Sequence, residues 1–312
     1  MTLDAVSPGK IHIGISGWRY KGWRGVFYPE KLPQRRELEF ASRKFDTIEL
    51  NGSFYSLQRA QSFLQWHAET PQDFTFAIKG SRYITHMLRL RNVEGPLANF
   101  FAQGLLHFGT KLGPILWQLP PNFTFEPERL EQFFASLPRT VKQAAELARN
   151  HDDRLNGRSW FQVRKDAPLR HALEIRHESF VTEKFIRLLR RYGVGSVVAD
   201  TVEWPLLMDV SSDFVYCRLH GSEQLYASGY EADALDVWAR RVVAWARGEE
   251  VTDGRRASTR DAPKRKRRDV FVYFDNDMKV RAPFDAEQLR IRVNGLLAGT
   301  APERGVEKGP KN

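Results

Sequence analysis

The stretch Val270–Leu297, VFVYFDNDMKVRAPFDAEQLRIRVNGLL, decides the fold of this 312-residue chain. It starts with a short apolar run, Val270–Phe274, which is typical of a strand buried on both faces. Asp285–Leu297 follows, with apolar residues recurring among charged ones, and this pattern indicates a helix. The stretch is therefore a strand followed by a helix. The fold then depends on how many strand–helix units precede this one in the chain.

Seven similar apolar runs precede Val270–Phe274, so the sequence predicts eight strands. The earlier seven are Ile11–Ser16, Phe45–Leu50, Phe74–Lys79, Pro114–Gln118, Ala172–Ile175, Gly195–Ala199 and Phe214–Leu219. Helical patterns lie between most of them, at Arg36–Lys44, Gln61–Ala68, Pro96–Lys111, Glu128–Leu137, Glu183–Tyr192 and Ala234–Arg247. Strands that alternate with helices form βαβ units with parallel strands.

Eight units with a helix after the last strand favour one closed (β/α)₈ barrel, a TIM barrel, over an open doubly wound sheet. We expect the barrel to occupy residues 1–300, with insertions near 139–170 and 248–269. The first insertion carries only a weak helical pattern. Residues 301–312 are polar, and we expect a disordered tail there.

Composition narrows the setting of the protein. The chain has no long apolar run and no signal-peptide pattern, so we expect a cytoplasmic protein without a membrane partner. Its single cysteine, Cys217, excludes an internal disulfide framework. The net charge of +10 suits an anionic partner. Half of that surplus comes from the run Lys264–Arg268, which fits either a solvated loop or a basic arm that touches phosphates.

The predicted strands change from apolar to polar at their C-terminal ends. The members of three polar pairs lie two positions apart, so each pair can point to one side of its strand. These pairs are Glu49 with Asn51, Glu174 with Arg176, and Arg218 with His220. Burial of so many charges against the helices would be costly, whereas the barrel mouth, where catalytic residues of such barrels lie, lets them pair. We therefore predict a functional mouth, with a structural salt-bridge network as the alternative.

The residue types suggest roles at that mouth. Arginine and lysine hold phosphate or carboxylate groups, and carboxylates or histidine transfer protons. The predicted acid and base residues are Glu49, Glu174, Asp200 and His220. The predicted ligand-binding residues are Trp18, Asn51, Tyr55, Lys79, Gln118, Arg176, His177, Arg218, Asn276 and Asp277. Ser81–His86 adds Arg82 and His86 after the third strand.

The sequence leaves the cofactor open. Glu49, Glu174, Asp200 and His220 include ligand types that suit several divalent metals. A metal is not favoured, however, because no metal-binding spacing is present and two arginines share the predicted site. The chain also lacks a P-loop, a G-x-G-x-x-G turn and a G-x-S-x-G motif.

The polar strand ends lie within segments that resemble the YecE-like family, domain of unknown function 72. The resemblance runs in order from about Ile11 to Leu297. Its segments are GISGWRYKGWRGVFYP (14–29), FDTIELNGSFYSL (45–57), FTFAIKGSRYITH (74–86), LGPILWQLPPNF (112–123), ALEIRHESF (172–180), VVAD (197–200), YCRLHG (216–221) and VYFDND (272–277). It implies a TIM barrel but brings no established activity. The family pattern near the last strand is usually F-N-N-D, whereas this chain has Asp275 at the second position.

Three hypotheses follow. The first is an enzyme or a binding barrel for a phosphate-containing or other anionic ligand, with nucleic acid among the candidate ligands. The second is a metal-dependent phosphoesterase, endonuclease-like or sugar-isomerase-like enzyme, by analogy with barrels of similar kind. The third is a non-catalytic nucleic-acid-binding module that uses residues 264–268. The sequence does not predict the substrate or the oligomeric state.

Overall fold

The computed structural model describes residues 7–221, 225 and 228–300. Its eight parallel strands close into a barrel in chain order, with β8 hydrogen-bonded to β1. The strands are β1 (Ile11–Ser16), β2 (Thr47–Leu50), β3 (Thr75–Lys79), β4 (Leu112–Gln118), β5 (His171–Glu174), β6 (Gly195–Asp200), β7 (Phe214–Leu219) and β8 (Asp269–Phe274). The predicted TIM barrel is confirmed, and an open sheet is excluded.

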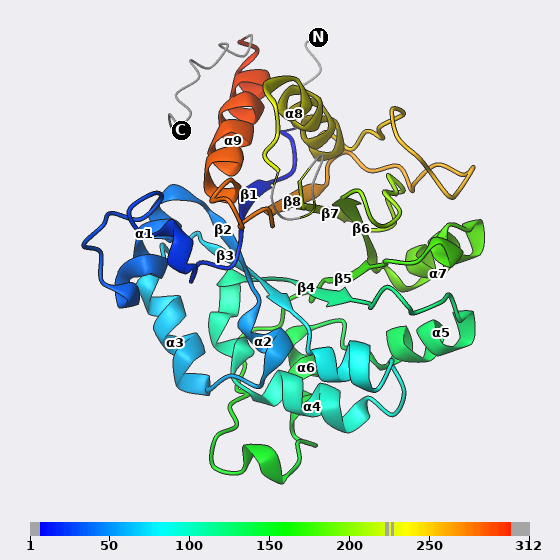
Figure 1. Cartoon of the computed structure of the whole chain (residues 1–312). Coiled ribbons are helices and arrows are strands. Elements are labelled where there is room, and N and C mark those ends of the chain that lie inside the picture. The colour runs from blue at the N-terminus through cyan, green and yellow to red at the C-terminus, as the bar shows by residue number, and fades with distance from the viewer. Residues whose placement is uncertain (1–6, 222–224, 226–227, 301–312) are drawn as a thin grey trace, which may run out of the picture.

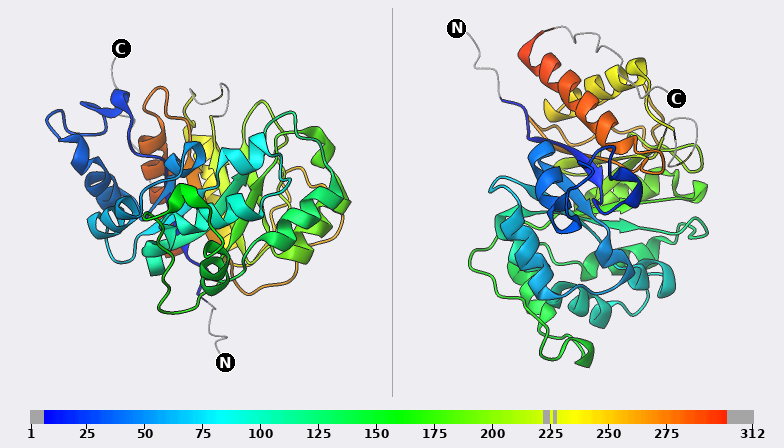
Figure 2. Two further views of the ribbon diagram at one scale, coloured as in Figure 1. Left: turned by 90° about the horizontal axis from the view of Figure 1, so that it is seen from below. Right: turned by 60° about the vertical axis from the view of Figure 1, so that its left-hand side comes forward.

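Helices surround the strands (Figure 1). They are α1 (Glu37–Lys44), α2 (Gly52–Tyr55), α3 (Ala60–Glu69), α4 (Glu94–Ala102), α5 (Pro127–Ser136), α6 (Val141–Ala148), α7 (Glu183–Tyr192), α8 (Ala232–Ala246) and α9 (Ala282–Ala298). Short helical turns are η1 (Lys21–Trp23), η2 (Gln34–Arg36), η3 (Tyr83–Met87), η4 (Leu105–Lys111), η5 (Asp153–Leu155) and η6 (Glu178–Phe180). Helices α8 and α9 pack against each other beside β8 (Figure 2).

The helix expected over residues 96–111 is broken in two. Helix α4 ends at Ala102, and η4 begins at Leu105. Between them Gly104 has a φ of 113°, which residues with a Cβ rarely adopt. A Cβ on Gly104 would also lie 2.5 Å from the Cα of Ala60. The break thus comes from close packing of this turn against α3.

Both segments expected as insertions are packed against the barrel. Residues 139–170 contain α6, in which Thr140 caps the backbone N–H of Gln143 and Val141, Ala144 and Ala148 form the buried face. No helix connects β6 to β7 in this fully described connection. Residues 249–268, which follow α8 in the chain, pack outside β6 and β7 instead and lie in space between α7 and α8 (Figure 1). The predicted tail at 301–312 lies outside the described residues.

Asp209 ties the segment 249–268 to the connection between β6 and β7. Its two carboxylate oxygens accept hydrogen bonds from the backbone N–H groups of Ala257 (2.7 Å) and Ser258 (3.0 Å). Met208 is buried next to it, and its backbone N–H donates to the carbonyl of Arg255. The segment therefore covers a part of the barrel where a helix usually lies.

The barrel interior is filled by side chains that alternate along the strands. On the strands, this inner cluster consists of Ala77, Leu116, Ala172, Val197, Ala199, Phe214, Tyr216, Phe271 and Tyr273, and Trp204 joins it from the connection after β6. Residues two positions after its strand members point the same way, toward the C-terminal mouth. This alternation determines which strand-end residues reach the mouth. Cys217 has the opposite parity and is fully buried under the helices, as expected of a small apolar residue.

Candidate functional site

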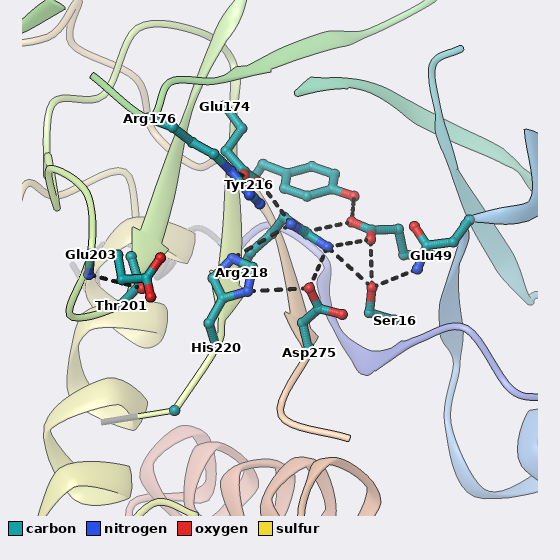
Figure 3. A network of polar contacts seen from close by, with 12 residues as sticks. Ser16, Glu49, Glu174, Arg176, Thr201, Glu203, Tyr216, Arg218, His220 and Asp275 are labelled. Carbon is teal, nitrogen blue, oxygen red and sulfur yellow. Dashed lines mark hydrogen bonds and ion pairs between the residues drawn. The ribbon is translucent and has the colours of Figure 1, made fainter. Parts of the chain in front are cut away.

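The mouth is centred on Arg218 of β7, which is 1% exposed (Figure 3). Its guanidinium contacts three carboxylates from three other strands. The Arg218 nitrogens lie 3.0 Å from an oxygen of Glu49 in β2, 2.7 Å from Glu174 in β5 and 2.7 Å from Asp275 just after β8. The planar fork of arginine can serve several carboxylates at once because it has five N–H donors. Arg218 thus joins the ends of β2, β5, β7 and β8.

Glu49 is bound by hydroxyl groups as well as by Arg218. Tyr216 donates a hydrogen bond to its Oε2 (2.6 Å), and Ser16 donates to its Oε1 (2.6 Å). Asn51 donates in turn to the hydroxyl of Ser16 (2.9 Å). Burial of a carboxylate is tolerated when its lone pairs are satisfied in this way. Glu49 is therefore fixed in orientation within the site.

The arginines keep the neighbouring carboxyls ionised. Burial raises the pKa of Glu174, but Arg176 and Arg218 outweigh that effect and hold it well below the usual range. Burial also raises the pKa of Asp275, but Arg218 and His220 outweigh burial and hold this pKa well below its usual range. His220 lies beside these carboxyls, with its Nδ1 3.2 Å from Oδ2 of Asp275. We call the whole set the buried cluster: Ser16, Glu49, Glu174, Tyr216, Arg218, His220 and Asp275.

A second group of residues lies on the β2, β3 and β5 side of the mouth and is rich in cations. Lys79, the last residue of β3, places its Nζ 4.5 Å from the ring centre of Phe54. His86 packs edge-on against the same ring. Burial lowers the pKa of His86 to about 4, and the nearby charges of Arg176, Lys79 and Arg82 add to this effect. The β3 loop and the end of β5 thus bring three cations together, and we call Lys79, Arg82 and Arg176 the cationic group; His86, with its lowered pKa, is a neutral neighbour of this group.

Arg176 connects the cationic group to the buried cluster. Its Nε donates to Glu174 (2.7 Å), and its guanidinium stacks 3.9 Å from the ring of Trp204. Beside it, Arg176, His177 and Trp204 help to line a cavity of about 540 Å³ between the loops that follow β5 and β6. The guanidinium is therefore held at the rim of the mouth by a carboxylate and an aromatic face.

Two amide side chains at the mouth have buried oxygens without a protein partner in the described part of the chain. They are Oδ1 of Asn51 and Oε1 of Gln118. Gln118 pairs in register with Glu174 on the neighbouring strand. A buried acceptor without a hydrogen bond costs about 1–3 kcal/mol. These oxygens are consequently available to hydroxyl or N–H groups of a ligand.

Several predicted site residues lie elsewhere. Asp200 follows the inward-facing Ala199, so it points out to α8 and accepts from the indole of Trp238 (3.2 Å). Asn276 also points outward and donates to Asp285 of α9 (2.8 Å). Both are polar residues at strand ends, but their parity places them behind the barrel wall.

Three further predicted residues lie at the edge of the mouth or outside it. Trp18 is buried edge-on against Trp66 of α3. His177 caps η6 by accepting from the backbone N–H of Ser179 (3.1 Å). Tyr55 is 69% exposed and contacts Phe54.

Asp277 is close enough to Asp275 to be affected by its charge. Burial, together with Asp275, raises the pKa of Asp277 to about 6. Asp277 therefore belongs to the edge of the cluster.

Sequence reasoning missed three residues of the cluster, although their parity was readable. Tyr216 lies two residues before Arg218, and Asp275 lies two residues after the inward-facing Tyr273. Ser16 ends β1 with the same alternation. Asp275 is also the residue that departs from the usual family pattern, and it supplies one of the three carboxylates on Arg218.

The basic run Lys264–Arg268 has one buried residue and four exposed ones. Arg268 is buried, and its guanidinium donates to the carbonyls of Gly248 (2.7 Å) and Pro263 (2.9 Å). Residues 264–267 are exposed. They precede β8 and so lie toward the end of the barrel opposite the mouth. The run is an ordered part of the wall with a charged outer edge.

Within 7–221, 225 and 228–300, no group of three or more His, Cys, Asp or Glu side chains is arranged to hold a metal ion. In the same residues, no helix has both the length and the apolar character required to cross a membrane.

The fold and this mouth define a TIM barrel with a buried ionic cluster and an adjoining group of cations. A family model described as protein of unknown function DUF72 matches residues 12–306, so the chain belongs to the DUF72 family.

Two curated relatives are similar over part of the chain. The UPF0759 protein YunF of Bacillus subtilis is 30% identical over 125 residues, which are 38% of this chain and 43% of YunF. The UPF0759 protein YecE of Escherichia coli is 27% identical over 140 residues, which are 44% of this chain and 48% of YecE. These alignments span less than half of either relative.

Two solved structures share the fold. A DUF72 family protein of Thermotoga maritima has a TM-score of 0.69 and 24% identity, and the match covers 90% of this chain and 98% of that one. A DUF72 family protein of Enterococcus faecalis has a TM-score of 0.63 and 14% identity, over 97% and 99% of the two chains.

Proposed function

We propose that the barrel mouth binds a small metabolite that carries a phosphate or carboxylate group. The observation that carries this proposal is the pairing of charges. Arg218 engages all three carboxylates of the buried cluster, whereas no carboxylate in the described residues lies within 4.0 Å of Lys79. An anionic group beside Lys79 would supply the missing counter-charge.

Arg176 supports the same location. Its Nε donates to Glu174, its guanidinium stacks on Trp204, and its charge lies close enough to His86 to help lower the pKa of that ring. Arginine recognises phosphate and carboxylate through two parallel N–H donors, and lysine adds a point charge. Lys79 and Arg176 together therefore suit one anionic group between β3 and β5. Arg218 serves instead to hold the acidic residues.

Calorimetric titration tests the proposal. The protein is titrated at low salt with glycerol 3-phosphate, with uncharged glycerol as the control ligand. Because a hydrogen bond to a charged group contributes about 1.5–3 kcal/mol, Lys79→Met should weaken binding at least about 10-fold. The matched control is Lys266→Met, at an exposed lysine toward the opposite end of the barrel, which should leave binding unchanged. Equal losses in the two variants, or no binding of anions by the native protein, would refute the proposal.

A further inference from the structure

Lys79 differs from the other buried cations of the barrel. It is 9% exposed, and in the described residues its Nζ makes no hydrogen bond and no ion pair. Lys111, which is 4% exposed, donates instead to the carbonyls of His67 (2.6 Å) and Thr70 (2.9 Å). Arg218 is matched by three carboxylates. Lys79 is thus a nearly buried amine that faces the mouth over an aromatic ring.

This environment favours the neutral amine. Burial lowers the pKa of Lys79 to about 8, and the charge of Arg218 acts in the same direction against the attraction of Glu49. A lysine in water has a pKa of about 10.4, so at pH 7 the neutral fraction of Lys79 is on the order of 100-fold larger. Only the neutral amine has the lone pair needed for attack on carbon.

We propose that Lys79 forms an imine with the carbonyl carbon of the anionic ligand. The inference rests on the function proposed above and narrows its ligand to an aldehyde or ketone. Lys79 then has two roles in sequence, because its charged form attracts the anion and its neutral form reacts.

The chemistry balances without an oxidant. The Nζ lone pair forms a bond to the carbonyl carbon, and a proton passes from nitrogen to oxygen to give a carbinolamine. The carbon–oxygen bond then breaks, and the oxygen leaves as water with the second amine proton. The product is a carbon–nitrogen double bond, which a hydride donor can reduce to a stable secondary amine.

The surrounding acceptors narrow the ligand further. Oδ1 of Asn51 and Oε1 of Gln118 are buried acceptors without a partner among the described residues. Asn51 directly follows β2 and Gln118 ends β4, and these two strands flank β3, which ends at Lys79. They suit hydroxyl donors. The chemical class is therefore a hydroxy aldehyde or hydroxy ketone that carries a phosphate or carboxylate.

Reductive trapping tests the inference. The full chain is incubated at pH 7 with glyceraldehyde 3-phosphate, which has an aldehyde, a free hydroxyl and a phosphate, and with sodium cyanoborohydride, and the modified lysines are located by peptide mass spectrometry. We expect one dominant adduct, at Lys79, and its formation should be suppressed by glycerol 3-phosphate. Uncharged glycolaldehyde should lack this preference and label exposed lysines.

Two variants and the native protein separate this inference from the function on which it rests. Lys79→Arg keeps the positive charge but has no amine that can form an imine, so it should form no adduct in the mouth. Lys111→Met changes a buried lysine outside the mouth and should leave labelling of Lys79 unchanged. If the native protein binds glycerol 3-phosphate and labelling of Lys79 does not exceed that of exposed lysines, imine formation is overturned and anion binding stands. If glycerol 3-phosphate does not bind, both proposals fall.

Discussion

Replacement of Lys79 by methionine should make the protein more stable at neutral pH. Lys79 holds its ammonium where burial opposes the charge, and no carboxylate of the described residues is paired with it. Methionine has a similar length and no charge, so it relieves that cost. We therefore expect that loss of a residue in the proposed binding site stabilises the protein, in accord with the general conflict between stability and function.

The pKa gives the magnitude. A lowering from 10.5 to about 8 corresponds to about 3 kcal/mol, because a tenfold change in proton affinity is about 1.4 kcal/mol. Below pH 8 both the folded and the unfolded states carry the proton, so the full penalty applies. Between pH 8 and 10.5 the unfolded state binds more protons than the folded state, and the stability of the native protein rises with pH. The advantage of the variant should therefore shrink by about 2 kcal/mol between pH 7 and 9.5.

Urea unfolding followed by circular dichroism, repeated from pH 7 to 9.5, measures both quantities. Lys111→Met is the matched control, and it should destabilise the protein because it leaves the carbonyls of His67 and Thr70 without their donor. A lower stability of Lys79→Met than of the native protein at pH 7 would refute this prediction. It is also refuted if the difference between the two proteins does not change with pH.

Three further predictions concern the parts of the barrel that support the site. Arg218→Met should destabilise the protein by about 3–5 kcal/mol in urea unfolding at pH 7, since it leaves buried carboxylates unpaired, and an unchanged midpoint would contradict this. The native protein should lose stability as pH falls below about 4.5. Glu174 and Asp275 have lower pKa values in the folded state than in the unfolded state, so the unfolded state takes up protons first as the pH falls. A flat profile from pH 5 to 3 would contradict this. Asp209→Ala should cost about 1–3 kcal/mol and speed hydrogen exchange at the amides of Ala257 and Ser258, whereas unaltered exchange there would show that Asp209 does not hold this segment.

The barrel was predictable because a buried parallel strand leaves a continuous apolar run. The predicted runs lie within one or two residues of the observed strands, as with Phe214–Leu219, which matches β7. The break at Gly104 was not predictable, because it depends on contact with Ala60 far away in the sequence. The helical pattern continues across it.

The buried cluster was partly predictable from the alternation of side chains. The inner cluster sets the parity, so Glu49, Glu174 and Arg218 point inward, whereas Asp200 points outward to Trp238. Equal treatment of every polar strand end places Asp200 in the site, whereas the departure of Asp275 from the usual family pattern leaves Asp275 out of it. Counting in steps of two from the apolar core would have corrected both.

The cationic group was less accessible from sequence. Lys79 ends a strand and could be placed, but its contact with Phe54 and the proximity of His86 depend on the loop conformations of α2 and η3. Neither loop has a repeating pattern that fixes its backbone. The absence of a carboxylate beside Lys79 within the described residues also depends on three-dimensional packing, since Arg218 must first engage the acidic side chains.

A crystal structure of the protein soaked in tungstate, a heavy tetrahedral anion, would test the central claim most directly. The account predicts anomalous density in the mouth, within hydrogen-bond distance of Nζ of Lys79 and the guanidinium of Arg176, and its loss in Lys79→Met. Density confined to the exposed residues 264–267, with none at the mouth, would contradict it.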